Sequence, residues 1–297
     1  MKIAITGATG LVGRGLVRHL QGLGHDIHAL VRQKEAAAGI YWNPAAGEID
    51  SAALEGMEAV IHLAGENLAG YWSRAKKERI LASRRDGTRL LGTALAGLKK
   101  PPRVLISASA TGFYGDCGDA ELDESAPRGS GFLADVCVAW EGAAEAARRA
   151  GIRVVHPRFG IILDARGGAL AKLLPLLRLG LGGKLGSGRQ YWSWIMMEDV
   201  HRGLAFLLEH PQLSGAVNFA APGPVTNAEF TQTAARLLRR PAFFAVPAPA
   251  LRLVMGEMAQ EMLLSSARVV PGRLLAAGFA FAHAHLETAL RELLAEK

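Results

Sequence analysis

Three glycines near the start of the chain have the spacing of a phosphate-binding loop. Gly7, Gly10 and Gly13 follow the apolar run 2–6 and precede apolar residues at helical spacing. The first glycine permits a tight turn, the second lets the backbone approach a pyrophosphate, and the third lets the helix pack on the sheet. The helix N-terminus then faces the phosphate charge. The spacing predicts a dinucleotide site, with a purely structural turn as the alternative.

The end of the second predicted strand indicates which dinucleotide binds. A carboxylate there would accept the ribose 2′-OH of NAD, whereas a cation favours the 2′-phosphate of NADP. Arg32 follows that strand directly, Lys34 comes two residues later, and Glu35 comes too late to serve. Arg32 can hold a phosphate with two parallel hydrogen bonds. We therefore expect NADP(H), the alternative being a surface arginine in a loop.

Further stretches resemble a known superfamily. The TGxxGxxG spacing resembles the extended branch of the short-chain dehydrogenase/reductases, the branch of the nucleotide-sugar epimerases. Four further stretches resemble other motifs of that branch in the same order, so that the resemblance covers roughly residues 1–215. They are VIHLAG (60–65), ISASATGFYGD (106–116), HPRFGIIL (156–163) and WSWIMMEDVHRG (192–203). The stretches HLAGENL, SRRDGTRLL and VPAPALRLVMGE resemble the uncharacterised "epimerase family protein" subgroup, which has a distinctive C-terminal domain.

This resemblance implies NADP(H) as cofactor and an unknown small molecule as substrate. It also implies a set of cofactor contacts in the glycine loop, after the second and third strands, on the long charged helix and after the fifth strand. These are Gly7, Thr9, Gly10, Leu11, Val12, Gly13, Arg32, Leu63, Ala64, Gly65, Arg84 and Ile162. For Arg84 the alternative is a solvated helix face.

The superfamily's acid–base chemistry uses a tyrosine whose pKa is lowered by a lysine four residues later. The four tyrosines, at positions 41, 71, 114 and 191, have Ala, Ala, Gly and Ile at that spacing. No lysine occurs between Pro101 and Ala171, and Phe132 stands near the tyrosine's place. We predict that the usual pair is missing, so the catalytic residue is unknown.

The substitutes for that pair are weak candidates. Ser109 is near the superfamily's catalytic serine, although a shift of one residue would put Ala110 there. Tyr114 follows the fourth strand and has a structural role as its alternative. Glu141, expected to begin a helix, is more typical of a cap or an ion pair. An aromatic strand could line a pocket or belong to the core; its residues are Gln190, Tyr191, Trp192 and Trp194.

Two functions fit these residues. One is an NADP-dependent, epimerase-like oxidoreductase with unusual acid–base groups, in which a water or a substrate hydroxyl relays the proton. The other is a non-catalytic protein that binds NADPH and changes its conformation or partner.

Alternating strands and helices must position these residues. Strands are expected at 2–6, 26–31, 58–64, 103–109 and 153–157, and helices at 11–22, 73–98 and 133–150. Apolar strands alternating with helices predict a doubly wound parallel sheet, the Rossmann fold.

The second half of the chain predicts a smaller, mostly helical lobe. We assign residues 1–165 and about 190–215 to the Rossmann domain, and about 166–189 and 216–297 to the lobe. The five glycines in 180–188 predict a loop. Thr226 and Glu229 predict a capping box for a helix at 227–239.

The composition limits the other partners. The net charge is +7, but the basic residues do not cluster, so an anionic small ligand is favoured over nucleic acid. No apolar run reaches the roughly 18 residues of a membrane span, so no membrane partner is expected. The two cysteines form no metal or disulfide pattern and suit a reducing cytoplasm. His283 and His285 are expected at the surface, with no metal site, and the oligomeric state is open.

Overall fold

The computed structural model describes residues 1–33 and 39–295 of the 297-residue chain. Lys34 and Glu35 therefore lie outside the described residues.

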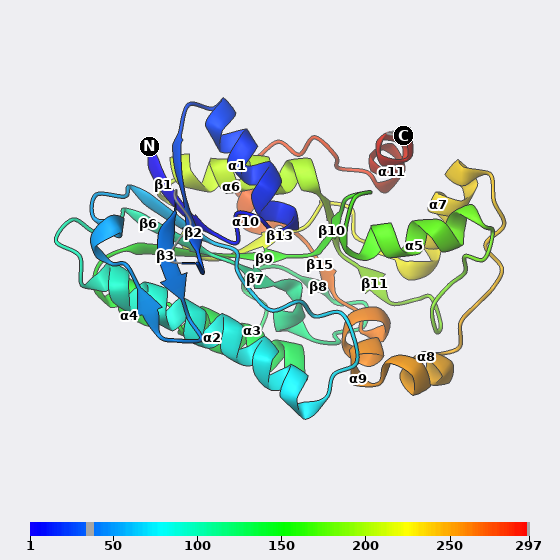
Figure 1. Cartoon of the computed structure of the whole chain (residues 1–297). Helices are drawn as coiled ribbons and strands as arrows, with labels where there is room; N and C mark the ends of the chain where they lie inside the picture. Colours follow the sequence, from blue (N-terminus) through cyan, green and yellow to red (C-terminus); the bar gives the residue numbers. More distant parts are fainter. Residues whose placement is uncertain (34–38, 296–297) are drawn as a thin grey trace.

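One large sheet forms the centre of the molecule, and it is parallel except for one antiparallel pair, β3 with β4. Its order is β13 (Gly215–Phe219), β9 (Arg153–Phe159), β6 (Val104–Ser107), β5 (Ala59–His62), β1 (Lys2–Thr6), β2 (Asp26–Val31), β3 (Ile40–Asn43) and β4 (Glu48–Ile49), with β7 (Ser109–Ala110) on β9. Chain order runs outward from β1 in both directions, so the crevice for a ligand is expected beside β1 and β5. The predicted doubly wound sheet is confirmed (Figure 1).

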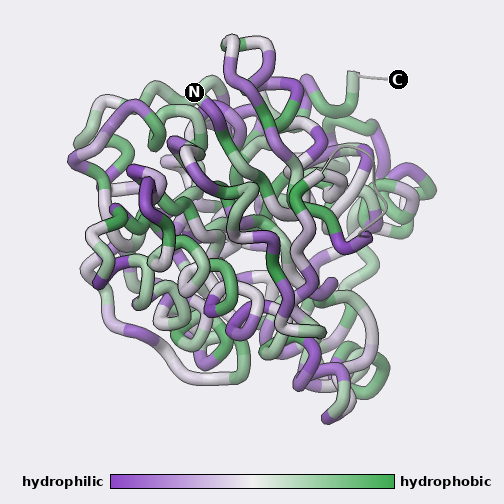
Figure 2. The backbone as a smooth tube through the Cα atoms, turned by 60° about the vertical axis from the view of Figure 1, so that its left-hand side comes forward, coloured by the Kyte–Doolittle hydropathy of each residue, from purple (hydrophilic) through white to green (hydrophobic). Residues whose placement is uncertain are grey.

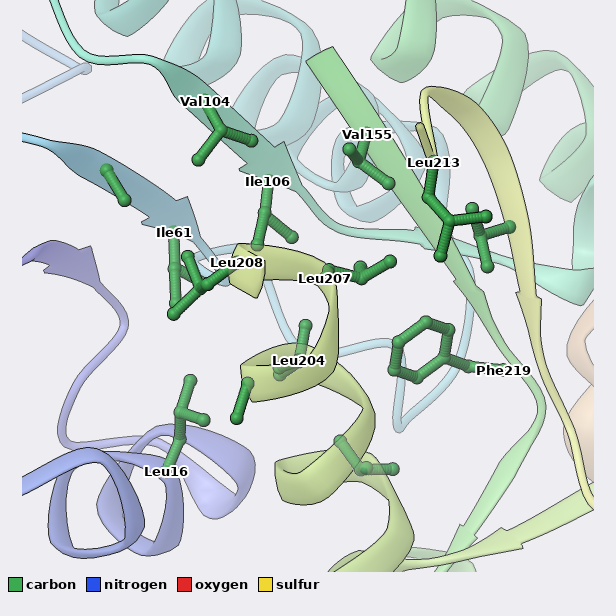
Figure 3. Close-up of a cluster of buried hydrophobic side chains, with 14 of the residues drawn as sticks. Leu16, Ile61, Val104, Ile106, Val155, Leu204, Leu207, Leu208, Leu213 and Phe219 are labelled. Carbon is green, nitrogen blue, oxygen red and sulfur yellow. The ribbon is translucent and has the colours of Figure 1, made fainter. Parts of the chain in front are cut away.

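Helices cover both faces of this sheet because alternate strand residues point to opposite sides. One core joins Ile3, Ile5 and Ile61 to α1 (Leu11–Gly22) and α6 (Met197–Glu209). Figure 3 shows Leu204 and Leu208 of α6 beside Ile61 and Ile106 of the strands. The other core joins Ala4, Val60 and Leu105 to α2 (Arg74–Ala96) and α4 (Glu145–Arg149). Hydrophobic stretches run through the centre of the molecule, and many outer turns are hydrophilic (Figure 2).

The observed bounds match several expectations and correct others. The strands at 2–6 and 26–31 and the helix at 11–22 have the predicted bounds. The helix expected at 133–150 is instead two helices, α3 (Phe132–Gly142) and α4. Two strands, β3 and β4, were not expected.

The C-terminal part has its own helical core. It is formed by α5 (Gly168–Arg178), α7 (Asn227–Leu238) and α11 (Leu286–Ala295), with β10 (Ile161–Leu163) and β12 (Trp194–Met196) beside them. The capping box of Thr226 and Glu229 is confirmed at the start of α7. Residues 180–188 form no helix or strand, as expected. The chain continues through α8 (Ala248–Met255), α9 (Glu257–Ala259) and η3 (Gln260–Leu264).

The two parts are interlocked, which corrects the expected domain boundary. β13 belongs to the main sheet, although residues from 216 onward were assigned to the lobe. After η3, the strand β15 (Arg268–Val269) pairs with β8 (Glu121–Leu122) of the Rossmann part. Leu274 of α10 (Gly272–Ala276) and Phe279 lie in the core under the main sheet. Local patterns did not reveal these pairings because their partners are distant in sequence.

Candidate cofactor site

The glycine loop lies at the carboxyl end of β1 and has no room for larger side chains. Gly7 has φ +70°, and a Cβ there would lie 3.0 Å from the Ala64 nitrogen. A Cβ on Gly13 would overlap the Gly7 carbonyl oxygen and lie 2.8 Å from the Ala8 Cα. Glycine therefore lets the loop, the end of β5 and the start of α1 approach each other closely.

The tip of this loop is open at the N-terminus of a twelve-residue helix. Thr9, Gly10 and Leu11 are exposed. Gly10 is the N-cap of α1, no side chain of the described residues caps the helix, and its first turn holds no acidic residue. The first N–H groups and the helix dipole are therefore available to an anion. This geometry is what a dinucleotide pyrophosphate requires.

A hydroxyl connects the loop to the end of β5. The Thr6 Oγ1 accepts hydrogen bonds from the backbone of Leu63 (3.1 Å) and Ala64 (3.2 Å) and lies 2.6 Å from Nδ1 of His62. Burial, together with the nearby Arg84 charge, lowers the pKa of His62 to about 4. The imidazole is therefore neutral near pH 7. Because the Thr6 Oγ1 already accepts two backbone hydrogen bonds, its hydroxyl donates a hydrogen bond to Nδ1. This pair was not predicted from the sequence, where its signal is a polar residue at the end of each of two apolar strands.

Arg84 lies half-buried beside the loop that follows β5. One guanidinium nitrogen donates to the Glu66 carbonyl (3.0 Å) and the Ile80 carbonyl (3.2 Å), and the group lies over the Trp140 ring. A Cβ on Gly65 would be 3.3 Å from the Arg84 Cζ. No carboxylate in the described ranges forms an ion pair with it, and burial lowers its pKa. A buried guanidinium without a counter-ion favours the predicted cofactor contact over a solvated helix face.

Arg32 is exposed at the end of β2, and within residues 1–33 and 39–295 it has no ion pair. Arg14 folds over the glycine loop, donating from Nε to the Thr9 carbonyl at 2.7 Å. Arg14 and Arg18 line a groove between α1 and β2 that reaches Ala8 of the loop. These two cations were not predicted from the sequence, where their signal is a pair of arginines at helical spacing directly after Gly13.

The other predicted contacts lie around the same loop. The Val12 carbonyl is 3.1 Å from Nε2 of His201. A Cβ on Gly167 would be 2.6 Å from the Leu11 side chain, and one on Gly168 would be 3.6 Å from the Ile162 carbonyl. Leu11 and the end of β10 therefore meet at the mouth of the glycine loop.

The region expected to hold the acid–base groups contains a buried polar network. Ser109 donates to Oε1 of Glu141 (2.7 Å), and Arg158 makes two bonds to the Glu141 carboxylate (2.8 and 2.9 Å). The Arg158 guanidinium lies over the Phe113 ring and is 5% exposed. Burial alone would raise the pKa of Glu141, but the Arg158 and Ser109 hydrogen bonds outweigh it, and the pKa is lowered. Glu141 is therefore a charged ion-pair residue at the end of α3, not at the start of a helix as expected.

Tyr114 belongs to the same network. Its hydroxyl donates to Oδ1 of Asn218 (2.7 Å) and accepts from Arg158 (3.0 Å). The side chain is fully buried, and burial raises its pKa. These contacts leave no free hydroxyl for a substrate and favour the structural alternative. Arg158 was not predicted from the sequence, where its signal is a charged residue within an apolar strand.

The first turn of α3 is capped by the C-terminal part. The Glu261 carboxylate accepts from the backbone of Phe132 (3.2 Å) and Leu133 (3.1 Å). The Phe132 ring packs edge-on against Trp72. Near the place where the superfamily has its tyrosine, the backbone N–H groups are thus hydrogen-bonded to a carboxylate from η3.

The aromatic strand belongs to the core. Trp192 and Trp194 are buried in the C-terminal core, and Nε2 of Gln190 donates to the carbonyls of Leu185 and Leu263, both at 2.9 Å. These contacts favour the core alternative over the pocket.

His283 is buried, so the expectation that it lies at the surface is wrong. Its Nε2 is 2.9 Å from the Glu292 carboxylate, and its Nδ1 is 3.5 Å from Asp199.

No helix in the described part of the chain is long and apolar enough to cross a membrane.

Comparisons with known proteins identify the family of this chain. Residues 3–220 match the NAD dependent epimerase/dehydratase family, and residues 246–293 match a domain of unknown function, DUF1731. The chain is 43% identical over 290 residues to the epimerase family protein Mb2239 of Mycobacterium bovis, covering 97% of this chain and 96% of that protein.

Two solved structures place the fold. The human epimerase family protein SDR39U1 (isoform 2), crystallised with NADPH, is 31% identical with a TM-score of 0.89 over 100% of both chains. The UDP-N-acetylglucosamine 4-epimerase of Bacillus cereus is 17% identical with a TM-score of 0.77, covering 99% of this chain and 98% of its own, and shows the fold alone. By sequence and fold, this chain belongs to the NAD dependent epimerase/dehydratase family.

Proposed function

We propose that this protein binds NADP(H) and acts as an epimerase-like oxidoreductase on a small molecule. The observation that carries the proposal is the open, uncapped N-terminus of α1 behind a loop in which Gly13 has no room for a side chain. The human relative crystallised with NADPH supports the choice of cofactor.

The residues around the loop fit the parts of this cofactor. The free N–H groups in the first turn of α1, which begins at Leu11, would hold the pyrophosphate. Arg32, with no ion pair among the described residues, would hold the 2′-phosphate and so select NADP over NAD. Arg84 would supply a second cation beside Gly65. When bound, the cofactor supplies a hydride donor or acceptor.

In this proposal the chain works without the usual tyrosine–lysine pair. Leu133 and Phe132 occupy the first turn of α3, and Tyr114 is already bonded to Asn218 and Arg158. The Ser109 hydroxyl donates a hydrogen bond to Glu141. The Ser109 oxygen can therefore still accept a hydrogen bond and orient a substrate hydroxyl. The proton of the redox step would then pass through that hydroxyl or a water molecule.

A second candidate is an NADPH-binding sensor that does not turn the cofactor over. The closed network of Ser109, Glu141, Arg158 and Tyr114 favours it, because no acid–base group of suitable pKa is free there. Both functions would be exerted in the cytoplasm, where the free cysteines Cys117 and Cys137 stay reduced.

A turnover assay distinguishes the two functions. The purified protein is incubated with NADPH, or with NADP⁺, and with panels of sugar nucleotides, aldehydes, ketones and alcohols, while the absorbance of the reduced nicotinamide is followed. Oxidation or reduction that is lost in Gly13→Ala supports the enzyme. Tight binding without turnover on any panel, together with NADPH-dependent protection from hydrogen exchange, supports the sensor. Absence of NADPH binding contradicts both.

A further inference from the structure

The end of the C-terminal part farthest from β1 carries large apolar side chains that nothing covers. Leu179 is 71% exposed, Phe243 is 75% exposed and Leu253 is 87% exposed. Large apolar side chains exposed together usually mark a site of interaction. We define the distal apolar surface as Leu176, Leu179, Leu181, Phe243, Phe244, Leu253 and Val254.

Most of these side chains come from two segments that lie side by side, and Leu253 and Val254 come from α8, which follows the second segment. A Cβ on Gly180 would be 3.2 Å from the Pro241 ring. Val246 donates to the Lys184 carbonyl at 2.9 Å, and Gly186 donates to the Val246 carbonyl at 2.8 Å. The glycine-rich loop thus runs along residues 241–246, which lead directly into α8. In Figure 1 these segments occupy the end of the molecule opposite α1 and β2.

The two segments that carry this surface hold charges of one sign. Residues 165–197 contain five Lys or Arg and residues 239–256 contain three, whereas neither segment contains an Asp or Glu. Arg166 pairs with Asp164 outside the first segment. Within these two segments, the exposed cations with no ion pair to a described residue are Lys172, Arg178, Lys184, Arg189, Arg239, Arg240 and Arg252.

Elsewhere on the described surface some cations have partners, and others, such as Arg32 and Lys99, have no ion pair. On α2, Arg85 pairs with Asp86, and Lys77 pairs with Glu257 at the edge of α8. The two segments beside the distal apolar surface thus contribute eight cations and no acidic residue to the net charge of +7.

From this combination we propose that the distal apolar surface docks onto an anionic lipid bilayer. Phe and Leu side chains on protruding loops can enter the boundary between headgroups and acyl chains, and flanking Arg and Lys bind anionic headgroups. A second copy of the chain does not fit, since a symmetric contact would bring the unpaired cations together. Docking of this kind needs no membrane-spanning segment. We therefore propose it in place of the expectation that the protein has no membrane partner.

Vesicle co-sedimentation tests the proposal. Full-length protein is mixed with phosphatidylcholine vesicles with and without phosphatidylserine, at low and at high salt. We expect binding only to the phosphatidylserine vesicles, and weaker binding at high salt because salt screens the cations. Absence of binding at low salt, or equal binding to both vesicles, overturns the proposal.

Two variants locate the contact. Phe243→Ser with Phe244→Ser removes the inserting rings, and Arg239→Gln with Arg240→Gln removes two cations. Each is expected to weaken vesicle binding about tenfold or more. NADPH binding and thermal unfolding, measured on the same samples, should stay as in the wild type and show that the variants fold.

Matched controls lie elsewhere on the molecule. Leu23→Ser changes another exposed apolar side chain, and Lys99→Gln with Lys100→Gln removes the same charge. Both should bind vesicles as the wild type does. Equal losses in the controls contradict the proposal. It also fails if the wild type is a dimer and the Phe243→Ser, Phe244→Ser variant a monomer, because the surface then joins two copies.

Discussion

The glycine loop and the first turn of α3 lie at the same carboxyl edge of the sheet, yet they differ in what their polar groups bind. At the loop, the N-terminus of α1 is uncapped, and Arg84 lacks a counter-ion among the described residues. At α3, the helix start is capped by Glu261, and Glu141 is paired with Arg158. Unsatisfied groups that a fold maintains indicate a ligand, whereas satisfied ones indicate structure.

The largest expected effect is on the glycine loop. Gly13→Ala should weaken NADPH binding by about a hundredfold or more, because its Cβ would displace the Gly7 carbonyl from the phosphate position. A fluorescence titration measures the Kd, and circular dichroism checks the fold. Gly22→Ala, in the same helix with nothing within 4 Å of its Cβ, should bind normally. If Gly13→Ala bound NADPH normally, the glycine loop would not be the ligand site that distinguishes it from the first turn of α3.

The next effect concerns the network at α3. Glu141→Gln should lower the free energy of unfolding by about 3–5 kcal/mol, because it leaves the Arg158 charge buried and unpaired. Urea unfolding measures this loss, and the Kd for NADPH should not change. Asp135 lies on the same helix and forms an exposed ion pair with Arg128. Asp135→Asn breaks this pair and should lower the free energy of unfolding by about 1 kcal/mol or less. Loss of NADPH affinity with full stability would make Glu141 a cofactor residue.

Two buried histidines make the fold sensitive to acid. Burial lowers the pKa of both His62 and His156 to about 4, below the ordinary value of 6.5. The unfolded chain therefore binds more protons between these values, and stability should fall by a few kcal/mol as the pH drops from about 6.5 to about 4. In His62→Leu the loss over this range should be about half as large. An unchanged pH dependence in that variant would contradict a buried, neutral His62.

Arg84 has a smaller effect that separates the two kinds of site. Arg84→Met should weaken NADPH binding about ten- to a hundredfold, since charged hydrogen bonds contribute about 1.5–3 kcal/mol. Stability should be kept or increased, because the variant removes a half-buried cation without a counter-ion. Arg85→Met, whose guanidinium pairs with Asp86 on the same helix, is the control and should bind normally. A variant that binds normally but unfolds more easily would place Arg84 among the structural groups.

The sequence predicted the glycine-loop half well because its signals are local. The spacing of Gly7, Gly10 and Gly13 and the apolar run 2–6 lie within thirteen residues, and the bounds of β1, α1 and β2 followed from them. Arg32 and Arg84 were also predicted from the sequence. Arg32 lies at the end of β2, and Arg84 lies beside the loop that follows β5.

The other half depends on contacts between distant residues. Glu261 caps a helix 128 residues earlier, and the Tyr114 hydroxyl binds Asn218, 104 residues later. No periodicity in the sequence marks either pair. For the same reason β13 was assigned to the lobe, and His283 was expected at the surface although it is buried beside Asp199.

The central claim is that the glycine loop and Arg32 form an NADP(H) site. The most direct measurement is a fluorescence titration of NADPH and of NADH into the wild type, Arg32→Ala and the neighbouring control Gln33→Ala. We expect the wild type and Gln33→Ala to prefer NADPH, and Arg32→Ala to lose about tenfold or more in NADPH affinity with little change for NADH. If neither nucleotide binds the wild type, or Arg32→Ala keeps the preference, the claim is contradicted.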